Sequence, residues 1–88
     1  MPTPIKTPPV TRTFRDLGVS TALSASGFPA QLDNRNGVVV FCFSGDPDQL
    51  DRIEREYWSG ALKLSVRDVV MSQRVLKDRL YAQKDMSR

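Results

Sequence analysis

The chain has 88 residues and a formal net charge of +3, and its 40% hydrophobic and 26% charged residues are typical of one globular domain. It contains no histidine and a single cysteine, which excludes an internal disulfide and a zinc site built from cysteine and histidine. No apolar run approaches the roughly 18 residues of a membrane span or resembles a signal peptide, so we expect a cytoplasmic protein without membrane contact.

The charge is distributed unevenly along the chain. Residues 1–15 carry three bases and no acid, whereas the remaining ten bases and ten acids cancel. Within this neutral part, residues 33–56 hold six acids against three bases, and residues 63–88 hold seven bases against three acids. A basic N-terminal arm and a basic last helix therefore flank an acidic middle.

Residues 1–10 are predicted to form an extended arm, because four of the six prolines lie there and proline fixes φ and removes a backbone donor. The next stretch, TRTFR at 11–15, alternates polar residues around Phe14 and predicts a short edge strand. Asp16 can then cap a helix that we expect over 17–26, and Gly27 can end it.

A β-hairpin has the strongest local signal in the sequence. Asn36-Gly37 tolerates the positive φ of a tight turn, and the run VVVFCF at 38–43 favours a strand. Because this run is apolar at every position, we expect a central strand whose two faces are both at least partly covered. Cys42 lies within it and is interpreted as an inert core thiol.

Three aspartates, Asp46, Asp48 and Asp51, follow this strand closely enough to raise the question of a metal site. Asp46 precedes Pro47 and has Gln49 three positions later, a pattern typical of a helix N-cap with proline at the first helical position. The helix dipole also favours acids in the first turn. An EF-hand loop would need further oxygen ligands and a glycine at its sixth position. We therefore interpret the cluster as a helix start and expect no bound metal.

The longest predicted helix covers 66–83, after a break at Gly60 and a capping pair formed by Ser65 and Asp68. A helical wheel groups six apolar residues on one broad face: Val66, Val69, Val70, Leu76, Leu80 and Tyr81. The opposite side carries Met71, Val75 and Ala82.

Together these elements predict an α+β fold, in which a small antiparallel sheet, made of the hairpin and a short edge strand, is packed by three helices. The predicted organisation is an extended arm at 1–10, a single domain at 11–84 and a C-terminal tail at 85–88.

The chain carries several short motifs in a characteristic order. They are Phe14, Asp16-Leu17, Gly27, the V-x-F-x-F strand at 39–43, Tyr57, Gly60 and LKDRLY at 76–81. In this respect residues 12–82 resemble a family of short, uncharacterised proteins from phages and prokaryotic mobile elements. The resemblance implies a prokaryotic cell, with incorporation in a virion as a further setting, and it supplies no functional residues. The proline-rich arm lies outside the shared pattern.

The residue types argue against catalysis. Without histidine, the candidate nucleophiles are Cys42 and the serines, and Cys42 lies inside an apolar strand. The five glycines are scattered at turns and helix ends and form no phosphate-binding loop. We therefore expect a protein that is not an enzyme and has no cofactor and no small-molecule substrate.

Two binding functions stay open. The first is a protein interaction, either docking on a larger assembly or self-association, through Trp58, Met71 and Val75. Met71 and Val75 belong, with Ala82, to a strip that is more apolar than a free surface needs, and Trp58 lies just past a helix end. The alternatives are that the helical wheel is rotated from its true orientation, or that the strip packs on the helix at 47–58. The second is nucleic-acid binding by bases of the arm and last helix, and its alternative is an ordinary solvated helix. The candidate bases are Lys6, Arg12, Arg15, Arg67, Arg74 and Lys84.

Overall fold

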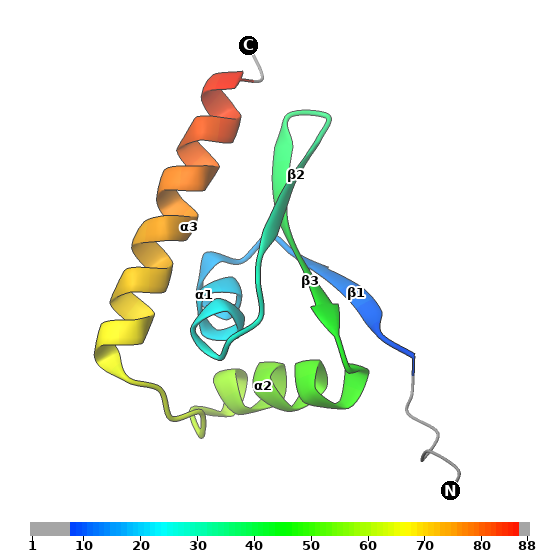
Figure 1. The fold of residues 1–88 in the computed structure, drawn as a ribbon, viewed down its shortest axis with the longest axis vertical. Coiled ribbons are helices and arrows are strands. Elements are labelled where there is room, and N and C mark those ends of the chain that lie inside the picture. The colour runs from blue at the N-terminus through cyan, green and yellow to red at the C-terminus, as the bar shows by residue number, and fades with distance from the viewer. Residues whose placement is uncertain (1–7, 87–88) are drawn as a thin grey trace, which may run out of the picture.

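The structure is a computed structural model that describes residues 8–86, with side chains described for 8–83. Its elements are β1 (Val10–Phe14), α1 (Leu17–Ala25), β2 (Gln31–Arg35), β3 (Val38–Gly45), α2 (Pro47–Ser59) and α3 (Val66–Met86) (Figure 1). The predicted α+β fold, a small antiparallel sheet packed by three helices, is confirmed. β1 begins at the last residue of the predicted arm, and α3 continues into the predicted tail. The rest of the arm, apart from Pro8 and Pro9, lies outside the described residues.

The sheet has the strand order β1-β3-β2, and β3 pairs antiparallel with both neighbours. β3 is therefore the central strand, as predicted. The β2–β3 turn consists of Asn36 and Gly37, whose φ values of 54° and 86° both fall in the left-handed region that this type of hairpin turn requires. The side chain of Asn34 accepts a hydrogen bond from the Gly37 amide at 2.9 Å and closes the turn.

The helices pack on only one face of the sheet. This face carries Phe41 and Phe43, which join a core drawn from all three helices: Leu23, Leu50, Ile53 and Leu76. The opposite face carries Val40 and Cys42, and their cross-strand neighbours Thr13, Gln31 and Asp33 are exposed. The prediction that both faces of β3 are at least partly covered is confirmed on this face by Val40, which is 7% exposed. Cys42 is half-buried there and lies outside the core cluster.

α1 is surrounded by the other elements, and its central turns, residues 19–23, are buried. Asp16 caps the helix as predicted, because its carboxylate accepts hydrogen bonds from the amides of Gly18 and Val19 at 2.6 and 3.2 Å. Gly27, at a φ of 105°, follows the helix and lets the chain turn toward β2.

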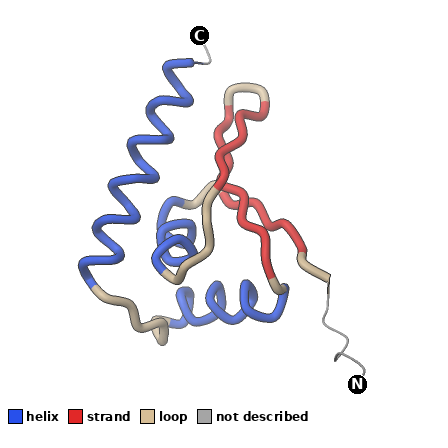
Figure 2. Tube along the Cα trace, in the orientation of Figure 1, coloured by secondary structure: helices blue, strands red, loops and turns tan. Residues whose placement is uncertain are grey.

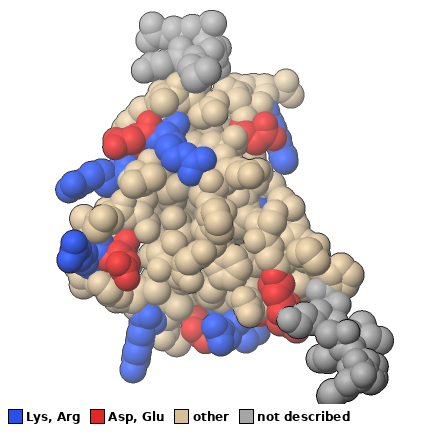
Figure 3. All heavy atoms as spheres, in the orientation of Figure 1, with Lys and Arg blue, Asp and Glu red and all other residues tan. Residues whose placement is uncertain are grey.

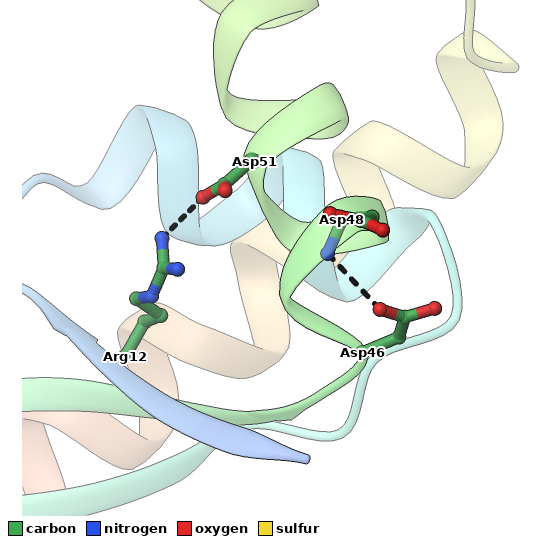
Figure 4. A network of polar contacts seen from close by, with 4 residues as sticks. All are labelled: Arg12, Asp46, Asp48 and Asp51. Carbon is green, nitrogen blue, oxygen red and sulfur yellow. Dashed lines mark hydrogen bonds and ion pairs between the residues drawn. The ribbon is translucent and has the colours of Figure 1, made fainter. Parts of the chain in front are cut away.

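The aspartate cluster begins α2, as predicted (Figure 4). Asp46 accepts a hydrogen bond from the Asp48 amide at 3.0 Å, and Pro47 occupies the first turn. Asp51 is further along the helix and pairs with Arg12 of β1. β1 thus brings a guanidinium to α2.

α3 stands beside the rest of the molecule as a long rod (Figures 1 and 2). Its packed side is a single narrow stripe: Leu76 is 1% exposed, and the half-buried residues are Val69, Ser72, Leu80 and Gln83. The predicted buried face is therefore wrong in part, since Val66, Val70 and Tyr81 are 78%, 48% and 58% exposed. The packed stripe follows i, i+3, i+7, i+11 and i+14 and includes two polar residues. Ser72 lies beside the small residues Ser24 and Ala25 of α1, and Gln83 lies beside Leu32 of β2.

Candidate protein-docking surface

One exposed side of α3 forms the wall of a groove. Met71 and Val75 are 53% and 52% exposed, and they line a hollow of about 410 Å³ together with Ser24 and Ala25 at the end of α1. We call this hollow the Met71 groove; its lining is Ser24, Ala25, Asp68, Met71, Ser72 and Val75. Ser24 and Ala25 have small side chains and form the floor of the groove, and the larger apolar side chains of Met71 and Val75 form its wall.

A second hollow of about 690 Å³ adjoins the first at Ala25, which lines both. It lies between the end of α1, α2 and the segment 61–64, and half-buried Phe28 and Leu62 supply part of its apolar lining. Arg52, Glu56 and Lys63 supply charge of both signs around it. The end of α1 thus borders two hollows: Met71 and Val75 line one, and the other has charged residues in its lining.

Trp58 does not belong to this surface. It lies at the end of α2, is 63% exposed, and stands nearly perpendicular to the Tyr57 ring at a centroid distance of 4.9 Å. Tyr57 lines a third hollow, of about 230 Å³, with Gly18 and Val69; this hollow shares Leu62 and Leu64 with the second one. Of the three residues predicted to bind protein, the structure therefore brings Met71 and Val75 together and leaves Trp58 apart.

The bases predicted to contact nucleic acid lie in several places. Arg12 pairs with Asp51 across β1 and α2, and Arg15 lines a hollow with Val38 and Leu80 near the hairpin end. Arg67 and Arg74 are exposed on α3, seven residues and therefore about two turns apart. Lys6 lies outside the described residues, as does the side chain of Lys84. On the face in Figure 3, basic side chains are interspersed with acidic ones around the outline rather than gathered in a patch.

Two structural contacts were missed by sequence reasoning. The Arg79 guanidinium donates a hydrogen bond to the backbone oxygen of Ala30 at 2.8 Å and ties α3 to the start of β2. Gly18 lies directly against the hydroxyl of Tyr57. Neither pairing has a local sequence signal, because the partners are 49 and 39 residues apart along the chain.

The described residues offer little for chemistry. Within 8–86, no group of three or more Cys, Asp or Glu residues is placed to hold a metal ion. Every buried side-chain nitrogen or oxygen in the same part of the chain has a hydrogen-bond partner, so none points unpaired into a hollow. No helix of this part is both long and apolar enough to cross a membrane.

Comparisons of the chain with protein-family models, with curated proteins and with solved structures return no match. The geometry of the Met71 groove is therefore the main guide to function.

Proposed function

We propose that this chain is a non-enzymatic interaction protein that docks on a larger protein assembly through the Met71 groove. The observation that carries the proposal is the pair of half-exposed apolar side chains, Met71 and Val75, above the small residues of α1. Methionine is enriched at binding surfaces because its flexible, polarisable side chain adapts to a partner.

The concave shape also supports a macromolecular partner rather than a small substrate. The two hollows at the end of α1 share Ala25 in their lining, and together they involve α1, α2, α3 and the segment 61–64. A partner helix or loop that enters such a groove buries apolar surface at its centre and meets charges at its margin, as in ordinary protein interfaces.

We propose that the protein belongs to a phage or mobile element and acts in a prokaryotic cytoplasm. It is carried into the virion if the assembly on which it docks is part of the virion. This part of the proposal rests on the sequence resemblance over residues 12–82.

Affinity co-purification from cells that naturally produce the chain tests the docking proposal. Proteins that bind through the groove should co-purify with the parent chain and be lost with the double variant Met71→Asp/Val75→Asp. Val70→Asp is the matched control, because Val70 is 48% exposed on another side of the same helix. Circular dichroism should show that all variants keep their helices. If the double variant retains every partner of the parent chain, the groove is not the docking surface.

A further inference from the structure

We infer that α3 is a releasable strap, a helix that detaches from the domain as a unit while α1, α2 and the sheet stay folded. Few contacts hold this helix in place. Among residues 66–83 of α3, Leu76 is the single buried one, and most of the others are exposed. α1 is less than half as long as α3 and is buried throughout residues 19–23. A long element with so little buried surface is expected to open more easily than the elements around it.

Polar contacts add little to this attachment. In the described part of the chain, the hydrogen bond from Arg79 to the Ala30 oxygen joins α3 to the sheet region, and the other bonds of α3 outside itself go to its capping residue Ser65. Neither of the two ion pairs among residues 8–83 involves α3. The hydroxyls of Ser20 and Thr21 on buried α1 donate to carbonyl oxygens one turn earlier in the chain, so they do not tie α1 to α3.

The rest of the domain has a core of its own. Its large buried side chains come from α1, α2 and β3 and form one cluster: Leu23, Leu50, Ile53, Phe41 and Phe43. α3 adds Leu76 to this cluster and Leu80 at its margin. Detachment of α3 therefore removes one buried side chain and leaves the contacts between α1, α2 and the sheet in place.

The released helix would not persist alone. Four β-branched valines, at positions 66, 69, 70 and 75, lower its intrinsic helix propensity. Most of the stability of a helix in a protein comes from packing, and a helix without it frays within microseconds. The α3 amides therefore lose their hydrogen bonds in the released state, whereas the amides of β3 keep theirs.

Release also abolishes the Met71 groove, because Met71 and Val75 of its wall belong to α3 and Ser24 and Ala25 of its floor belong to α1. A partner in the groove contacts both helices and holds the strap closed. Docking and closure of α3 are then one coupled equilibrium. This consequence rests on the proposed function, whereas release of α3 itself does not.

Native-state hydrogen exchange of the full-length chain in low concentrations of urea tests the inference without a partner. After correction for intrinsic rates, we expect the slowest α3 amides to exchange at least about tenfold faster than the slowest β3 amides. Their rates should rise with urea, but less steeply than those of β3, since release exposes less surface than unfolding.

Two results would overturn the inference. Equal rates and equal urea dependence in α3 and β3 would mean that α3 opens only when the whole domain unfolds. Amides near Leu76 that exchange with no urea dependence would mean that single turns fray without release. Both results leave the docking proposal standing, because co-purification tests that proposal independently.

Two variants separate release from unfolding. Ile53→Val removes a buried methyl group from α2, and it should speed exchange in β3 by about two- to tenfold. It should leave α3 exchange unchanged, because the closed and released states both lose the methyl group. Leu76→Ala should speed α3 exchange by at least about tenfold, because only the closed state buries this side chain. Equal acceleration of both elements by Ile53→Val, or unchanged α3 exchange in Leu76→Ala, contradicts release.

Discussion

At the scale of single residues, Gly18 shows how close packing limits substitution. A Cβ atom at this position would lie 2.1 Å from the hydroxyl oxygen of Tyr57 and 3.0 Å from the adjoining ring carbon. We expect Gly18→Ala to lower the free energy of unfolding by about 1–2 kcal/mol in urea titrations, because the overlap outweighs the higher helix propensity of alanine.

Removing the oxygen that causes the overlap provides the control. The double variant Gly18→Ala/Tyr57→Phe should recover part of the lost stability relative to Gly18→Ala, since the shortest contact disappears with the hydroxyl. If both variants unfold at the same urea concentration, contact with this hydroxyl is not the source of the loss.

At the scale of elements, the three aspartates near the start of α2 have separable roles. Asp46 caps the helix, so Asp46→Ala should lower the free energy of unfolding by about 1 kcal/mol. Asp48 accepts no such hydrogen bond, and Asp48→Ala should change stability by less than about 0.5 kcal/mol. Urea unfolding of the two variants measures the difference. Equal losses would mean that the acids act only through the dipole of the helix.

Local chemistry explains why most of the fold could be predicted. Asp16 and Asp46 cap their helices by accepting hydrogen bonds from amides two or three residues away, and Asn36-Gly37 alone forms the hairpin turn. Each of these features therefore depends on only a few adjacent residues. The orientation of α3 is different, because it depends on a distant surface. Ser72 is half-buried beside the small side chains of α1, whereas Val66 is exposed. Apolar periodicity alone predicts the opposite burial for these two residues.

The same distinction holds for the candidate site. Met71 and Val75 could be singled out because both lie off the main apolar face of one helix. That Ser24 and Ala25 form the floor beneath them could not, because this contact joins segments more than 40 residues apart. Trp58 was grouped with them only by its hydrophobicity, and α2 carries it elsewhere.

At the scale of the whole molecule, the scattered bases argue against the nucleic-acid alternative. Binding to a phosphate backbone gains affinity from each cation that neutralises a phosphate, so several cations must lie along one path. Among the described residues, Arg12 is paired with Asp51, Arg15 lies between β1 and α1, and Arg67 lies on α3. We expect no change in the anisotropy of labelled single- or double-stranded DNA at physiological salt.

Low salt is the sensitive condition for this test. If binding appears there with a steep salt dependence, and Arg67→Ala/Arg74→Ala/Lys84→Ala lowers both affinity and slope, the nucleic-acid alternative replaces the docking proposal.

Self-association through α3 would also stabilise the fold of the whole molecule. A domain of this size is only marginally stable alone. α3 packs on the rest of the domain through one stripe and leaves Met71 and Val75 exposed to water. Because only the folded chain can dimerise, self-association through this side would raise the Tm of the parent by a few degrees for each tenfold increase in concentration. The Tm of Met71→Asp/Val75→Asp should not change with concentration, whereas that of Val70→Asp should follow the parent. Scanning calorimetry measures the Tm of all three chains. A parent Tm that is independent of concentration would mean that self-association through α3 does not stabilise the fold.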